Sequence, residues 1–239
     1  MRWLARLLGR AARLDPALDE RVARWRQLAR SDNKALLEDA RVVVVDVETT
    51  GLDPGRDRLI AIGAVSVCGM RLEVGQGFEV VIRDIGPADD AVLIHGIAPA
   101  EREQGEEAPE AVLRFLELAG SAMLVAFHAP FDRRVLEVAA SRELGVRMRN
   151  RWLDLAWLAP ALYPEVGPER GGLDAWLDRF GLRPHVRHRA LGDALITGEL
   201  FLILLHRARA SGIRDLAGLR RLAHAQERVS RASAGVTGV

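Results

Sequence analysis

The sequence predicts an α/β domain built on a mixed central sheet, and three observations lead to this fold class. Residues 41–47 contain a run of valines, which favours a central strand covered on both faces. Residues 59–67 and 70–82 follow after short connections, as the strands of an antiparallel meander do. The rest of the chain then alternates between strand-like and helix-like stretches, which is typical of an α/β domain with helices around the sheet.

Residues 1–38 predict a helical extension ahead of this domain. Leucines recur at helical spacing over residues 4–14, and Asp15-Pro16 is a helix-start signal. The apolar stripe of the second helix is Leu18, Val22, Trp25 and Leu28, and arginines occupy much of the remaining surface. We expect this extension to pack on the main domain or on a partner. Contact with a membrane surface or with nucleic acid is the alternative, because basic amphipathic helices do either.

The remaining elements follow from periodicity and from the positions of proline and glycine. In order, we expect a loop with short helical turns over 86–109, a helix over 110–119, a strand over 121–127, and helices over 131–144, 152–162, 173–180, 190–209 and 214–227. Residues 229–239 are rich in Ser, Ala and Gly, so we expect them to fray. The predicted organisation is an extension (1–38), one domain (39–210) and a C-terminal helix with a flexible tail (211–239).

Charge and cysteine content exclude several classes of protein. The 34 basic and 33 acidic residues give a net charge of +1, so any phosphate binding must be local. Cys68 is the only cysteine, which rules out an internal disulfide and a cysteine-based zinc site. No run of about 18 apolar residues predicts a membrane span, and the N-terminus lacks the features of a signal peptide. We therefore expect a cytoplasmic enzyme.

Two carboxylates, Asp46 and Glu48, interrupt the end of the first strand. Side chains two residues apart on a strand share a face, so these two acids project together. Like charges at the end of a buried strand repel and lose hydration, unless a cation neutralises them. An Asp-x-Glu pair also occurs in solvated loops. A hard divalent metal held by oxygen ligands is nevertheless the simplest reason for this arrangement.

Further acids lie in two later stretches. Asp132 follows Phe131 in the first turn of a predicted helix, where the helix dipole alone favours an acid. Asp193 lies between small residues on an otherwise apolar helix, so it is expected to be partly buried and to need a partner. His188 precedes that helix, and its alternative interpretation is an exposed loop histidine flanked by arginines.

Taken together, these motifs resemble the DEDDh 3′–5′ exonucleases, the family that includes the proofreading subunit of the bacterial replicative polymerase. The matching segments are Asp-Val-Glu-Thr-Thr-Gly-Leu at 46–52, Ile-His-Gly-Ile at 94–97, Phe-Asp at 131–132 and His-Arg-Ala-Leu-Gly-Asp-Ala at 188–194. The resemblance covers roughly residues 41–210 and implies a ribonuclease-H-like exonuclease fold. One departure is Phe127-His128, where the family commonly has His-Asn, and this puts the positioning of the second motif in question.

The resemblance also implies roles for individual residues. Asp46, Glu48, Asp132 and Asp193 would hold two Mg²⁺ or Mn²⁺ ions. His188 would act as general base, since an unperturbed imidazole pKa of ~6.5 suits proton removal near neutral pH. The expected substrate-binding residues are Thr49, Gly51 and Leu52 at the terminal sugar, Asp90 and His95 at the terminal nucleotide, and Phe131, for which core packing is the alternative. Arg133, Arg134, Arg187 and Arg189 would guide phosphates or form ordinary solvated surface.

The implied activity is hydrolysis of phosphodiester bonds at a free 3′ end, with release of 5′-mononucleotides. We expect single-stranded DNA as the substrate, with an RNA-trimming exoribonuclease of the same family as one alternative. A non-catalytic nucleic-acid-binding or assembly module on the same fold is the other. A polymerase or another protein would be a partner through the N-terminal helices, and a membrane is not expected as one.

Overall fold

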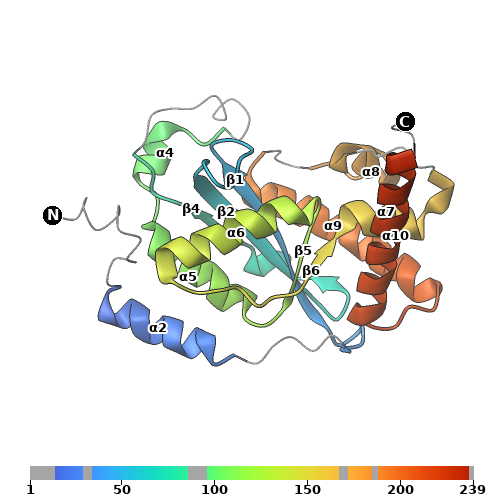
Figure 1. The fold of residues 1–239 in the computed structure, drawn as a ribbon, viewed down its shortest axis with the longest axis horizontal. Helices are drawn as coiled ribbons and strands as arrows, with labels where there is room; N and C mark the ends of the chain where they lie inside the picture. Colours follow the sequence, from blue (N-terminus) through green and yellow to red (C-terminus); the bar gives the residue numbers. More distant parts are fainter. Residues whose placement is uncertain (1–13, 29–33, 86–95, 167–171, 185–187, 237–239) are drawn as a thin grey trace.

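The computed structural model describes residues 14–28, 34–85, 96–166, 172–184 and 188–236, and within these ranges one six-stranded sheet forms the centre of the fold (Figure 1). The strand order is β3-β2-β1-β5-β6, and β4 pairs with β2. The strands are β1 (Arg41–Thr49), β2 (Leu59–Cys68), β3 (Arg71–Leu72), β4 (Phe78–Val81), β5 (Met123–Ala126) and β6 (Trp152–Asp154). β1 runs antiparallel to β2 and parallel to β5, which confirms the predicted mixed sheet.

Helices cover both faces of the sheet. They are α2 (Pro16–Arg26), α4 (Pro99–Glu103), α5 (Ala108–Ala119), α6 (Ala129–Leu144), α7 (Leu155–Leu162), α8 (Leu173–Phe180), α9 (Ala190–Ala210) and α10 (Leu216–Val236). Short 3₁₀ turns lie at Val74–Gln76 and Pro164–Val166. None of the helices in the described ranges is long and apolar enough to cross a bilayer.

The alternation of side chains along β1 divides the core into two parts. Val43, Val45 and Val47 pack with α5 and α6 on one face, whereas Val42 and Val44 pack with α7, α9 and α10 on the other. This burial on both faces is why β1 is a nearly unbroken run of valines. Asp46 and Glu48 continue the alternation of Val42 and Val44, so they belong to the face that α9 covers.

The structure corrects two sequence-based predictions. The single strand expected over 70–82 is split into β3 and β4 by the 3₁₀ turn at Val74–Gln76, where Gly75 and Gly77 weaken a strand. The helix expected over 152–162 begins only at Leu155, because residues 152–154 pair in parallel with β5 instead. In addition, α10 continues to Val236, well into the stretch where the composition predicts fraying.

The described part of the N-terminal extension packs on the domain. Asp15 caps α2 as predicted, accepting the N–H of Ala17 at 2.9 Å. The indole Nε1 of Trp25 donates to the carbonyl of Leu116 in α5 at 2.9 Å, and Trp25 is buried. The helix expected over 4–14 lies almost entirely outside the described residues. Leu18, Val22 and Trp25 of the predicted stripe are thus packed within the chain, whereas Leu28 is exposed.

Candidate metal centre

The site begins where β1 and β2 run side by side at the end of the buried valine run. Asp46 lies opposite Gly63 of β2 in the antiparallel register. A Cβ atom on Gly63 would lie 2.0 Å from the backbone carbon of Ala190, the first residue of α9. Only glycine therefore lets the start of α9 lie against the sheet at this point. Because of this close packing, the first turn of α9 lies beside Asp46.

Asp193, in that first turn, completes a cluster of three carboxylates. Each of Asp46, Glu48 and Asp193 contributes one carboxylate oxygen, and these three oxygens lie within 4.8 Å of one another. Asp193 is 6% exposed, and its Oδ2 accepts the backbone N–H of His188 at 2.8 Å. Three carboxylates at this separation repel strongly unless a cation lies between them. Their oxygens are the hard ligands that a divalent cation such as Mg²⁺ prefers.

Asp132 lies beside this cluster, close to Glu48. It is 5% exposed and belongs to the first turn of α6, whose positive dipole end favours an acid. Burial, reinforced by the nearby charges of Asp154 and Glu48, raises the pKa of Asp132 to about 8, although N–H groups including that of Val47 act in the opposite direction. A buried carboxyl among other acids, with its ionised form disfavoured, is the electrostatic signature of a site built for a cation.

Sequence reasoning missed Asp154. It ends β6, accepts the N–H of His128 at 3.0 Å, and caps α7 through the N–H of Ala156 at 3.0 Å. Burial raises its pKa. An acid just before the apolar run of α7 is a helix-start signal, which could have identified this residue as an N-cap. Asp154 thereby connects the start of α7 to the start of α6, which carries Asp132.

The contact with Asp154 also explains how the chain accommodates His128 where the family commonly has Asn. His128 caps α6 in the left-handed region, with φ 63° and ψ 44°. Among residues with a Cβ, histidine joins Asn and Asp in tolerating this region. The backbone N–H of His128 is held by Asp154, and its ring packs edge-on against Phe127 with centroids 4.9 Å apart. The helix start therefore has fixed contacts without an Asn side chain.

His188 lies at the edge of the cluster. Its side chain is exposed, its backbone has φ 60°, and its N–H is the group that Asp193 holds. It stands two residues before α9, as the sequence predicts for a histidine in a loop ahead of a helix. The backbone of His188 is thus tied to the carboxylate cluster, while its imidazole is exposed to solvent.

The predicted substrate-binding residues fall into three groups. Thr49 donates its hydroxyl to the carbonyl of Gly51 at 2.6 Å, which shapes the turn after β1, and Leu52 on that turn is 88% exposed. Phe131 is half-buried and packs against the α5–α6 core, so its core role is the one that the structure describes. Asp90 and His95 lie outside the described residues.

The arginines near the motifs are mostly engaged with acids. Arg189 bonds Glu101 at 2.9 Å and approaches Glu79 at 3.4 Å, and Arg133 pairs with Glu137 at 2.8 Å. Arg187 lies outside the described residues. The guanidinium of Arg189 is therefore used to hold α9 against α4 and β4, which leaves it poorly placed to guide phosphates.

Solved structures share this fold. Crystal structures of E. coli exonuclease I, one in complex with a dT13 oligonucleotide, superimpose with a TM-score of 0.61 at 20% sequence identity. The match covers 72% of this chain and 42% of the other. At this sequence identity the similarity concerns the fold alone. It confirms the predicted fold, which is the ribonuclease-H-like fold of exonucleases.

Comparisons of sequence extend this result. The chain is 36% identical over 183 residues to a DNA polymerase III subunit epsilon-like protein of Rhodobacter capsulatus, covering 74% of this chain and 25% of that protein. It is 30% identical over 180 residues to the DNA polymerase III subunit epsilon of Haemophilus influenzae, covering 71% of this chain and 69% of that protein. The chain spans a quarter or less of the length of several relatives that it matches.

The family model described as exonuclease, RNase_T, matches residues 43–201, which is more than half of the 239 residues. These residues extend from β1, which carries Asp46 and Glu48, through α6 with Asp132 and into α9 with Asp193. The matched region thus contains every acid of the candidate metal centre. We conclude that this chain belongs to the exonuclease family.

Proposed function

We propose that this protein is a metal-dependent 3′–5′ exonuclease that hydrolyses single-stranded DNA from its 3′ end and releases 5′-mononucleotides. The observation that carries the proposal is the convergence of Asp46, Glu48 and Asp193 within 4.8 Å, with buried Asp132 beside them. Two Mg²⁺ or Mn²⁺ ions suit this donor set, since both prefer carboxylate oxygens. When bound, such ions would activate water and stabilise charge on the phosphate.

The residues of the chain supply the rest of the mechanism. His188, exposed at the edge of the cluster, accepts the proton of the attacking water at a neutral imidazole nitrogen. Asp193 accepts the backbone N–H of His188, and this bond sets the position of the general base relative to the carboxylates. The starts of α6 and α9 lie beside the cluster, and their N-terminal dipole ends favour the anionic phosphodiester. Leu52, exposed after β1, offers an apolar surface to the terminal nucleotide.

Two observations support DNA as the substrate and a polymerase as a partner. The matched relatives are named as polymerase III subunits, and exonuclease I has been crystallised with deoxyoligonucleotides. With Leu18, Val22 and Trp25 packed within the chain, a partner would meet α2 on its arginine-rich face or bind the residues ahead of it.

The activity test compares matched DNA and RNA oligonucleotides with a labelled 3′ end, in Mg²⁺ and in Mn²⁺. We expect stepwise release of mononucleotides, faster from single-stranded DNA. Asp46→Asn should lower the rate by about 100-fold or more, since the cation contributes several kcal/mol to the transition state. An equally active Asp46→Asn variant would refute the assignment, and faster degradation of RNA would favour the exoribonuclease alternative.

A further inference from the structure

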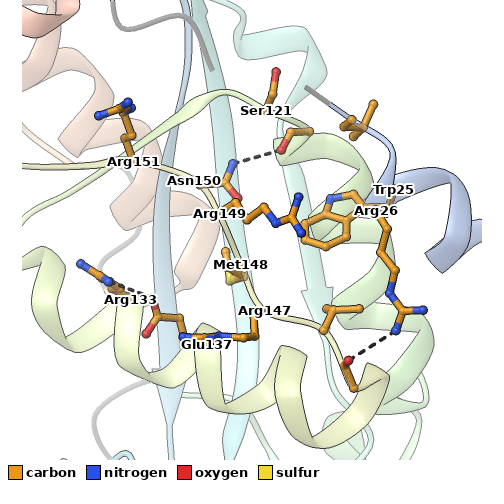
Figure 2. Close-up of a pocket in the computed structure, with 14 residues that line it drawn as sticks. Trp25, Arg26, Ser121, Arg133, Glu137, Arg147, Met148, Arg149, Asn150 and Arg151 are labelled. Atoms are coloured by element: carbon orange, nitrogen blue, oxygen red, sulfur yellow. Dashed lines mark hydrogen bonds and ion pairs between the residues drawn. The ribbon is translucent and has the colours of Figure 1, made fainter. Parts of the chain in front are cut away.

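A second surface, away from the carboxylates, has the character of a binding groove. It lies between the end of α2, Arg133 and Glu137 of α6 and the segment 145–151, and it forms an open hollow of about 750 Å³ (Figure 2). Its lining carries the arginines Arg26, Arg133, Arg147, Arg149 and Arg151 and a single acid, Glu137. We call this surface the arginine groove.

The positive charge of the groove is largely uncompensated. Glu137 is already paired with Arg133 at 2.8 Å. Within the part of the chain that the structure describes, Arg147, Arg149 and Arg151 have no acidic partner. The whole protein has a net charge of only +1, so this concentration of guanidinium groups is a local feature. An uncompensated cluster of this kind creates a potential that attracts anions.

Two of these arginines alternate with more buried residues along the segment 145–151. Val146 is buried and Met148 half-buried, whereas Arg147 and Arg149 between and beyond them are exposed. Their side chains diverge, Arg149 toward Trp25 and Arg147 toward α6, so they present guanidinium groups at two points of the groove (Figure 2). The amide of Asn150 donates to the carbonyl of Gly120 at 3.0 Å (Figure 2) and to that of Ala122 at 2.8 Å, which anchors the end of the segment to the residues just ahead of β5.

One end of the groove reaches the start of α6, the helix that carries Asp132. Arg133, which lines it, directly follows Asp132 in α6. Gly145, at the other end of α6, also lines it, and these two residues are separated by ~18 Å along a helix axis. A polymer whose end lies at the carboxylates could therefore continue along this surface.

We propose that the arginine groove binds the sugar–phosphate backbone of a single nucleic-acid strand upstream of its 3′ end. The forked guanidinium of arginine matches phosphate oxygens in bidentate contacts, and half-buried Met148 and partly exposed Leu28 offer apolar contact to bases. An acidic peptide would also be attracted, but the reach of the groove to the start of α6, which carries Asp132, favours the strand whose end is hydrolysed. The choice of a nucleic-acid strand over a peptide rests on the proposed function.

The test measures binding without catalysis. Fluorescence anisotropy of a labelled single strand of about 20 nucleotides would be recorded in EDTA, at several salt concentrations, with the Asp46→Asn chain as the reference. Adding R147A/R149A should weaken binding roughly tenfold and reduce the salt dependence of log K by about 1.4, the value for two phosphate contacts on a single strand. A trinucleotide, which is too short to follow the groove, should show no such difference.

Two further variants make the result specific. R209A/R228A removes the same charge from exposed arginines of α9 and α10 that have no acidic partner among the described residues, and it should leave binding nearly unchanged. R147K/R149K keeps the charge without the forked guanidinium, so it should restore the salt dependence but only part of the affinity. Unchanged binding in R147A/R149A, or an equal loss in R209A/R228A, would overturn the proposal. The assay involves no hydrolysis, so the groove proposal and the nuclease proposal can fail independently of each other.

Discussion

At the scale of single residues, Gly63 is as necessary for the geometry of the candidate metal centre as the acids themselves. Gly63 has no side chain to point at Ala190, so α9 can approach β2 closely enough for Asp193 to meet Asp46. The acids are recognisable from their motifs. Gly63 looks like any glycine in a strand, and its role emerges only from the helix packed on it.

Gly63→Ala is therefore expected to abolish activity and to lower stability. Its Cβ would lie 2.0 Å from the backbone of Ala190, so α9 must move away from the sheet and take Asp193 with it. Overpacking of this kind typically costs ~1–3 kcal/mol or more. Nuclease rates and urea unfolding would be measured beside Gly75→Ala, whose new Cβ meets nothing within 4 Å. Equal behaviour of the two variants would contradict this role of Gly63.

Asp154 offers a second prediction at this scale. Its Oδ1 accepts both the N–H of His128 and that of Ala156, so Asp154→Ala removes a cap that is typically worth ~0.5–2 kcal/mol. Because His128 begins the helix that carries Asp132, metal affinity should also fall, by about 10–100-fold as for other supporting contacts. Asp154→Asn retains an oxygen acceptor and should recover most of both losses. Calorimetric titration with Mn²⁺ measures the affinity, and an Asn variant as weak as the Ala variant would disprove this account.

At the scale of elements, α2 is held to α5 by a buried indole and by ion pairs. Arg21 bonds Glu110 at 2.7 Å and Glu117 at 2.6 Å, and Trp25 bonds the backbone of α5. The hydrogen bond from Arg21 lowers the pKa of Glu117 in the folded protein. The pairs are partly exposed, so each contributes little, and the buried Trp25 carries most of the docking energy.

The lowered pKa of Glu117 predicts how this docking depends on pH. A carboxyl with a depressed folded-state pKa stabilises the fold above its unfolded pKa, about 4.5, and loses that contribution as the pH falls through the folded value. The wild type should therefore be slightly more stable than Glu117→Gln at neutral pH. The difference should shrink as the pH falls below 4.5 and vanish once the pH is below the depressed folded-state pKa. The measurement is the melting temperature of both proteins from neutral pH down into this acidic range. A difference that grows on acidification would have the wrong sign.

At the scale of the whole molecule, the sheet gathers the acids by its topology. Asp46 and Glu48 end β1, Asp132 follows β5 and Asp154 ends β6, and these three strands run in parallel. Carboxyl ends of parallel strands meet at one edge, where open α/β sheets bind their ligands. The fold thus accepts unfavourable repulsion at this edge, which a bound cation would relieve.

This repulsion predicts a specific response to metal. Saturating Mn²⁺ should raise the melting temperature of the protein by about 5–10 °C, since binding at 100 times Kd contributes ~2.7 kcal/mol. Asp193→Asn removes one of the repelling charges, so without metal it should melt at or above the wild-type temperature. It should also respond to Mn²⁺ much more weakly. A variant that is less stable than the wild type in EDTA and fully responsive to Mn²⁺ would rule out this electrostatic account.

Local patterns were sufficient for much of this molecule. The β1 valine run, the Asp15 cap of α2 and most helix ranges follow from propensities and periodicity, which act between near neighbours in the chain. The missed strand β6 shows the limit of such patterns. Its three residues have no strand signal strong enough to compete with the helix that follows, and they become a strand only because β5 provides hydrogen-bonding partners.

The sequence by itself determined the acids, their order and the family, because these depend on residue type and spacing along the chain. Only the tertiary structure decided that Asp193 meets Asp46 because Gly63 lacks a side chain, that Asp154 supports His128, and that Arg147 and Arg149 border the same groove as Arg133. The physical reason is that these contacts join residues far apart in the chain. Their distances are set by the packing of helices on the sheet, which no local pattern contains.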